Sequence, residues 1–118
     1  GERLALLQEA KRRGITTYAF LGPLLPYLSD TEASLAPLLK AVKDAGVDYF
    51  YVDRLNRRFG VWLSLKHLLQ EHFPHLIEGY RKIFFDENAG MEYSERLVFC
   101  INHTSRKLGL DSKLRLCF

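Results

Sequence analysis

The densest cluster of polar side chains directly follows an apolar run over residues 47–53. It consists of Asp53, Arg54, Asn56, Arg57 and Arg58. Arginine guanidinium groups bind carboxylates and phosphates through two parallel hydrogen bonds, and an aspartate can orient a hydroxyl or a basic group. A ligand site is therefore one interpretation. An internal salt bridge with a solvated turn is the other, and residue types alone favour neither.

A second candidate is the Gly22-Pro23 pair, which ends an earlier apolar run over residues 15–21. Glycine lets a ligand approach the backbone closely, because it has no side chain. Ordinary turn chemistry explains the same pair equally well. Both candidates come at the ends of expected strands, and in α/β proteins ligands bind beyond the carboxyl ends of strands.

The remaining reactive residues do not form a recognisable site. The histidines are spread along the chain, at His67, His72, His75 and His103, and Pro74 interrupts the helical spacing of the middle pair. Cys100 and Cys117 lack the spacing of metal ligands, so we expect no metal site. No serine–histidine–aspartate pattern, phosphate-binding loop or glycine-rich dinucleotide motif is present.

Hydrophobic periodicity predicts an α/β protein. We expect strands at about residues 15–21 and 47–53, and helices at about residues 2–13, 30–45, 59–72, 75–85 and 91–108. Gly14 and Gly46 should end helices, and Ser29 to Glu32 has the form of a capping box. Pro37 should kink the second helix or delay its start to a cap at Ser34. The single helix between the strands has the length of a right-handed crossover, so the strands should be parallel neighbours.

Two further segments complete this description. Residues 86–90 are expected to form a loop, and the alternating tail 113–118 is a candidate for a short edge strand. The chain of 118 residues has the size of one domain, and 47% hydrophobic residues can supply its core. Seventeen basic against 14 acidic residues do not demand a nucleic-acid partner. No membrane span or signal peptide is evident, and two unpatterned cysteines favour a reduced cytoplasmic setting.

Two stretches resemble the later part of radical S-adenosylmethionine proteins, in the branch similar to spore photoproduct lyase, also called DNA repair photolyase-like. These are YAFLGPLLPYLSDTE and AVKDAGVDYFYVDRLNRRFGVW. The family's segment of helix, Ala-Gly-Ile, strand and Pro-x-x-Pro-Gly-x-x-Asp is matched by residues 13–15 and 23–30. Tyr27 replaces the family's glycine there, which predicts a different turn. The resemblance is strongest from Gly14 to Trp62.

The resemblance implies a partial (β/α)6 barrel that cleaves S-adenosylmethionine reductively at a [4Fe-4S] cluster, giving a 5′-deoxyadenosyl radical. The family's C-x3-C-x2-C motif is missing here, so the chain resembles a carboxyl-terminal portion: two parallel strands, crossover helices and carboxyl-terminal capping helices over residues 1–118. Both cofactors are then expected in the full-length parent and neither in this chain alone. By the resemblance, the cofactor-binding positions are Leu21, Gly22, Pro23, Leu24, Asp53, Arg54 and Asn56.

The same resemblance sets the expected partners and activity. The parent would be a lyase-like enzyme, and this chain alone would be inactive. Its first partner would be the missing amino-terminal half of the barrel; without it, the chain is expected to pair with itself as a homodimer. Two alternatives stay open. One is a stand-alone module that binds phosphate or nucleic acid, and the other is a piece of an unrelated (β/α)8 enzyme. The catalytic residues and the substrate stay unknown.

Overall fold

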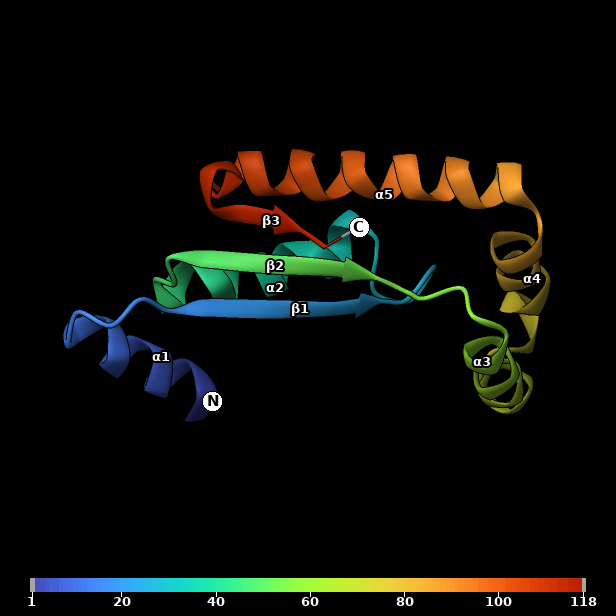
Figure 1. Cartoon of the computed structure of the whole chain (residues 1–118), viewed down its shortest axis with the longest axis horizontal. Helices are drawn as coiled ribbons and strands as arrows, with labels where there is room; N and C mark the ends of the chain where they lie inside the picture. The colour runs from blue at the N-terminus through green and yellow to red at the C-terminus, as the bar shows by residue number, and fades with distance from the viewer. Residues whose placement is uncertain (1, 118) are drawn as a thin grey trace.

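The protein is an α/β structure built on a three-stranded sheet in which all strands are parallel (Figure 1). The structure, a computed structural model, describes residues 2–117 without the side chains of residues 3, 4, 7 and 11. The central strand is β2 (Tyr49–Arg54), which lies between β1 (Tyr18–Leu24) and β3 (Leu114–Leu116). The α/β class and the parallel pairing of the first two strands are thus confirmed. The candidate edge strand in the tail is also confirmed, since β3 pairs with β2, so the sheet has three strands rather than the two of the barrel fragment; Phe118 is outside the described residues.

Both predicted strands begin later than expected. Residues 15–17 lead into β1, where the Thr17 backbone nitrogen donates to Asp48 Oδ2 over 2.7 Å and fixes the entry to the sheet. At its other end, β1 continues through Gly22 and Pro23, which are joined by a cis peptide bond, to Leu24. The strand therefore includes the pair that was expected to end it.

The helices are α1 (Glu2–Arg12), α2 (Glu32–Ala45), α3 (Phe59–His72), α4 (Ile77–Phe85) and α5 (Glu87–Lys107), with short 3-10 turns η1 (Pro74–Leu76) and η2 (Asp111–Lys113). Gly14 and Gly46 have positive φ of 76° and 68° just past α1 and α2, as predicted.

Two predicted helix starts are wrong. The cap of α2 is Thr31 rather than Ser29 or Ser34, and its Oγ1 accepts from the Ser34 nitrogen over 3.2 Å; Pro37 lies within the helix. The expected loop at residues 86–90 is the first turn of α5. The Asp86 carboxylate accepts from the Ala89 nitrogen over 3.1 Å and so begins the helix earlier.

The main core lies between one face of the sheet and helices α2 and α5. Phe50 and Val52 of β2 are both 0% exposed, and they pack with Leu39 of α2 and Ile101 of α5. Successive side chains of a strand point to opposite faces. The odd-numbered residues of β2 therefore lie on the other side of the sheet, away from these helices.

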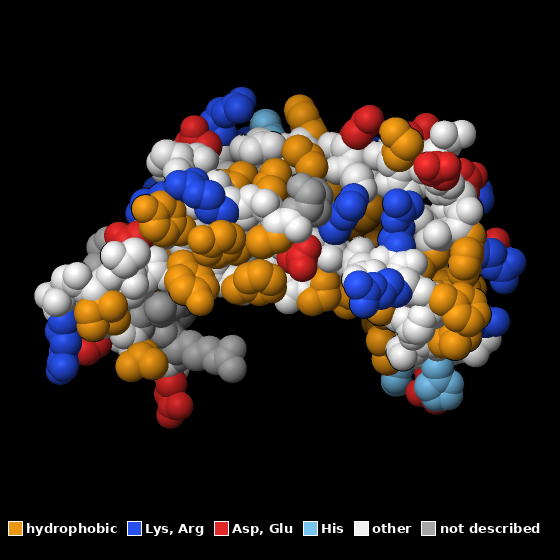
Figure 2. Space-filling view, viewed as in Figure 1, with side chains coloured by type: hydrophobic (Ala, Val, Ile, Leu, Met, Phe, Trp, Pro, Cys, Tyr) orange, Lys and Arg blue, Asp and Glu red, His pale blue; other side chains and the backbone are white. Residues whose placement is uncertain are grey.

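That other side is an uncovered aromatic face, formed by Tyr18, Phe20, Tyr49 and Tyr51. Tyr18 is 62% and Phe20 56% exposed, and the rings of Tyr18 and Tyr51 meet edge to face at 5.5 Å. The Arg115 guanidinium lies over the Tyr49 ring, 4.8 Å from its centre. Apolar side chains line this side of the strands in Figure 2.

Helices α3 and α4 form a second, smaller core beyond the carboxyl ends of the strands, around Trp62, Leu69 and Tyr80 (Figure 1). At the opposite end, α1 packs on α2, where Gln8 Nε2 donates to the Asp44 carbonyl, and extends past the free edge of β1.

The described chain is more extended than a compact domain of this length: its radius of gyration is 15.9 Å, against about 13.5 Å. Among the described residues, no helix has the length and apolar character needed to cross a bilayer.

Shortening a phenylalanine should have a large effect on stability in the main core and a small one at the exposed surface. Phe50→Ala should lower the free energy of unfolding by about 3–5 kcal/mol, because it leaves a cavity in the main core. Phe99→Ala is the control, since Phe99 on α5 is 70% exposed, and it should change stability by less than about 0.5 kcal/mol. Urea titration followed by circular dichroism measures both. Equal losses would contradict the described core.

Candidate functional site

Parallel pairing brings the predicted residues of both strands to one edge of the sheet. Leu24 is paired with Arg54, and Gly22 lies directly beside Asp53. The expectation that the two loops share one end of the sheet is therefore confirmed. Leu24 is buried and Leu21 packs on the main core, so their side chains point away from this edge. Only their backbone, with that of Gly22 and Pro23, is available to a ligand.

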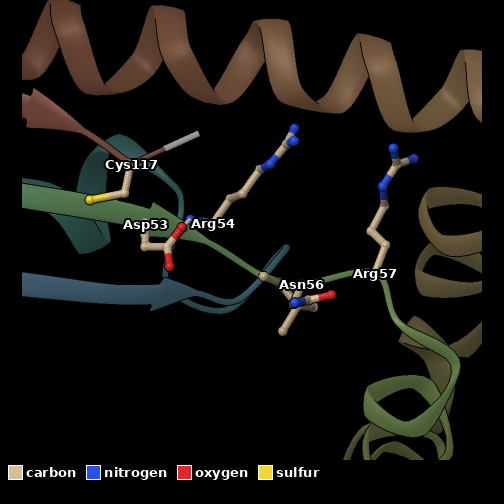
Figure 3. Close-up of a pocket in the computed structure, with 6 residues that line it drawn as sticks. Asp53, Arg54, Asn56, Arg57 and Cys117 are labelled. Atoms are coloured by element: carbon tan, nitrogen blue, oxygen red, sulfur yellow. Dashed lines mark hydrogen bonds between the residues drawn. The ribbon is translucent and has the colours of Figure 1, made fainter.

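A hollow of about 380 Å³ lies at this edge (Figure 3). Its lining includes three of the predicted residues, Asp53, Arg54 and Asn56. Cys117 also lines it and was not predicted as a site residue. It is carried there by β3, because the Cys117 nitrogen donates to the Val52 carbonyl over 3.0 Å. The alternating pattern of the tail was the available signal, but its partner strand could not be read from it.

Asp53 and Asn56 are the residues best placed to bind a ligand. Asp53 shares the parity of Tyr51 on β2, so its side chain is on the side of the aromatic face. Its Oδ1 accepts from the Arg54 nitrogen over 2.8 Å, and no further hydrogen bond to Asp53 is found among residues 2–117. Asn56 Oδ1 accepts from the Arg58 nitrogen over 2.9 Å, which leaves its amide nitrogen to donate. Neither side chain points towards α5 in Figure 3.

The arginines have a different role from the one that their sequence position indicates. Arg54 Nη1 donates to Ser94 Oγ of α5 over 2.6 Å, and Arg57 Nη1 donates to the Ile83 carbonyl of α4 over 3.3 Å. Both side chains extend towards α5 in Figure 3. They therefore anchor the last helices to the end of β2. Ser94, which sequence analysis missed, offered no local signal because it lies 40 positions away in the chain.

Gly90 explains how Arg57 reaches this position. A Cβ atom at Gly90 would collide with Arg57 Nη1, so only glycine leaves room for the guanidinium against α5. Gly90 itself is buried within that helix. The glycine that suggested a loop in the sequence is instead a packing site for an arginine.

The described residues do not supply a metal centre. No group of three or more histidine, cysteine or acidic side chains with suitable geometry is found among them. His67 and His72 lie 3.3 and 3.7 Å from the Glu71 carboxylate on the exposed side of α3. Cys100 packs at the margin of the main core, where burial raises the pKa of its thiol, while Cys117 lines the hollow at the sheet edge. The two cysteines therefore cannot share one cluster.

Gly22 is the backbone position on which the site geometry depends most. Its φ is 151°, and an added Cβ would lie 3.0 to 3.2 Å from the Asp53 backbone. Gly22→Ala should therefore lower stability by roughly 1–2 kcal/mol from the unfavourable φ alone. Gly60→Ala is the control, because nothing lies within 4 Å of a Cβ there, and it should leave stability unchanged or raise it by up to about 1 kcal/mol. Thermal unfolding measures the stability of both variants. Unchanged stability of Gly22→Ala would contradict the close contact of β1 with Asp53.

The chain was compared with known proteins by family, by sequence and by structure. No family model, no curated protein and no solved structure matches it.

Proposed function

We propose that the chain forms the carboxyl-terminal wall of a radical S-adenosylmethionine enzyme of the spore photoproduct lyase-like kind, and that the edge around Gly22 and Asp53 binds the nucleoside part of the cofactor. One observation carries the proposal. The sheet is parallel, is covered by helices on one face only, and has its polar hollow at the carboxyl ends of the strands. In (β/α) barrels, helices cover the outside, side chains of the strands line the interior, and ligands bind at this end.

The position of α1 supports a further strand beside β1. Helix α1 packs on α2 and extends past the free edge of β1 (Figure 1), and its Leu6 is 72% exposed. A crossover helix normally covers both strands that it connects. A parallel strand at the free edge of β1 would lie under α1 and bury this surface. In the proposal, that strand belongs to the amino-terminal half of the barrel.

The residues at the hollow fit a nucleoside by their chemistry. The Asp53 carboxylate has acceptor capacity beyond its bond to the Arg54 nitrogen, and vicinal ribose hydroxyls are suitable donors. The backbone at Gly22 is exposed, so a flat base can approach it, and the rings of Phe20 and Tyr51 lie two residues earlier in each strand on the same side. The Asn56 amide nitrogen can donate to the base or to the carboxylate of the cofactor.

The cofactor, when bound at a reduced [4Fe-4S] cluster, supplies a carbon radical for hydrogen abstraction. The described residues of this chain do not fit the cluster, so the proposal assigns to them only binding of the nucleoside and closure of the barrel wall. The parent would be the enzyme, and the cluster ligands would lie on its amino-terminal half.

A nucleic-acid-binding module is the second candidate, and the aromatic face is the observation that favours it. Single strands bind to exposed aromatic rings flanked by positive charge. Arg115 lies over Tyr49 and supplies such a charge. The other basic side chains give less support, since Arg54 and Arg57 are engaged by α5 and α4.

The two cysteines allow a direct test of cofactor binding. S-adenosylhomocysteine, a stable analogue, should slow alkylation of Cys117, which lines the hollow, and leave Cys100 unaffected. With only one wall of the barrel present, the dissociation constant should be on the order of 1 mM. Peptide mass spectrometry after iodoacetamide treatment reads both cysteines at once.

Variants sharpen this test. Asp53→Asn should abolish protection of Cys117, because the amide is a weaker acceptor for ribose hydroxyls, while the same change at Asp44, an exposed residue of α2, should not. Protection by oligothymidine but not by the analogue would favour the nucleic-acid module. Absence of protection by either would refute both candidates for this hollow.

The isolated chain should also associate through the surface that the barrel would bury. The exposed strand β1 carries no charge, and uncharged edges and apolar faces favour pairing with a second copy. Light scattering after size-exclusion chromatography, over a dilution series, should show a dimer that Phe20→Lys dissociates. Phe99→Lys on α5 is the matched control, with a phenylalanine that is also exposed. A monomer at every concentration would contradict this expectation without bearing on cofactor binding.

A further inference from the structure

A second pocket lies between α5 and the loop that joins β1 to α2. We call it the Tyr93 pocket; its volume is about 230 Å³, and it is lined by Tyr27, Asp30, Tyr93, Arg96, Leu97 and Cys100, among others. It shares no lining residue with the hollow around Asp53. Neither the cofactor nor the barrel wall proposed above uses it.

Opposite charges line this pocket without neutralising each other. Asp30 Oδ1 accepts from the Tyr27 backbone nitrogen over 3.0 Å, but no ion pair of Asp30 is found in the described part of the chain. The same holds for Arg96, which is exposed on α5. An anionic and a cationic group at one small pocket, each unpaired, can bind a ligand that carries both charges.

Tyr93 adds a polar group that lacks a partner. The residue is 8% exposed, and its hydroxyl makes no hydrogen bond of normal distance and angle among the described residues; the Asp30 carboxylate is its nearest polar neighbour. Burial, together with the nearby Asp30 carboxylate, raises the pKa of this phenol, so it stays protonated. Buried polar groups without a partner are rare, and each one calls for an explanation. A ligand group that contacts both the Asp30 carboxylate and the Tyr93 hydroxyl from the pocket would complete the hydrogen bonding of this phenol.

The opposite wall of the pocket is held in an unusual conformation. Tyr27 has a positive φ of 65°, at the position where the resembled family has glycine. Its ring rests on Gly79, where an added Cβ would lie 2.8 Å away. Below it, Tyr80 donates from its hydroxyl to the Pro26 carbonyl over 2.6 Å and fixes the loop to α4. The Tyr27 ring is therefore positioned before any ligand arrives.

We propose that the Tyr93 pocket binds a small zwitterion of the free amino acid class. The ammonium group would donate to Asp30 and to the Tyr93 hydroxyl oxygen, and the carboxylate would accept two hydrogen bonds from Arg96. Leu97 provides an apolar surface for a short side chain. The pocket volume is below the roughly 300 Å³ at which sites for drug-sized ligands begin, which excludes a nucleotide in favour of a small molecule.

Cys100 reports on this pocket, as Cys117 reports on the other. L-leucine should slow alkylation of Cys100 at least threefold at saturation and leave Cys117 unchanged. Isoamylamine lacks the carboxylate and 4-methylpentanoate lacks the ammonium group, so each should protect at least tenfold more weakly than leucine. Equal protection by all three compounds would show simple apolar binding and overturn the proposal. No protection of Cys100 by leucine, alanine, valine or phenylalanine would also overturn it.

Variants identify which end of the ligand each residue binds. Arg96→Gln should weaken leucine binding at least tenfold and 4-methylpentanoate binding as well, but not that of isoamylamine. Asp30→Asn should do the reverse, because asparagine still accepts from the Tyr27 nitrogen but carries no charge. Arg106→Gln, also exposed on α5, is the control. Circular dichroism confirms that each variant is folded. Unchanged leucine binding in folded Arg96→Gln and Asp30→Asn would refute the proposal.

Discussion

The alternation of side chains along β2 is the constraint on which the rest of the structure depends. Phe50 and Val52 are fully buried beneath α2 and α5, and this burial fixes which way every other residue of the strand points. A shift of one residue would exchange the core and the aromatic face. The same alternation places Asp53 on the uncovered side, next to Gly22 of β1. The hollow at the sheet edge is thus a consequence of core packing one and three residues earlier in the strand.

The helices at the end of the chain are held by contacts with the segment that follows β2. Arg54 reaches α5 through Ser94, and Arg57 reaches α4 through the Ile83 carbonyl. These hydrogen bonds close one side of the hollow with protein rather than leaving two free cations in it. The polar cluster that looks like an anion site in the sequence is therefore divided: Arg54 and Arg57 support the structure, while Asp53 and Asn56 line the hollow.

Local signals in the sequence predicted much of the fold. Gly14 and Gly46 end their helices with positive φ, and the apolar run at residues 47–53 is a parallel strand covered on one side by the main core. Apart from the helix caps at Thr31 and Asp86, which are local, the errors come from interactions between distant residues. The sequence predicts that Gly90 lies in a loop, but in the structure Gly90 is a helical residue against which Arg57 packs. The tail pairs with β2 rather than with a neighbour in sequence, so its place beside Val52 could not be deduced. For the same reason, Cys117 and Ser94 were absent from the predicted site.

The second core, around Trp62, Leu69 and Tyr80, has a consequence for motion. Helices α3 and α4 pack mainly in this second core, with Ile83 of α4 also joining the main core, and the segment at residues 55–58 links them to β2. Such a unit can open as a whole while the rest stays folded, with a lower free energy than global unfolding. Opening would break the bond of Tyr80 to Pro26 and that of Arg57 to Ile83 together. A single breathing motion would therefore loosen a wall of both pockets at once, so that occupancy of one favours order at the other without any contact between their ligands.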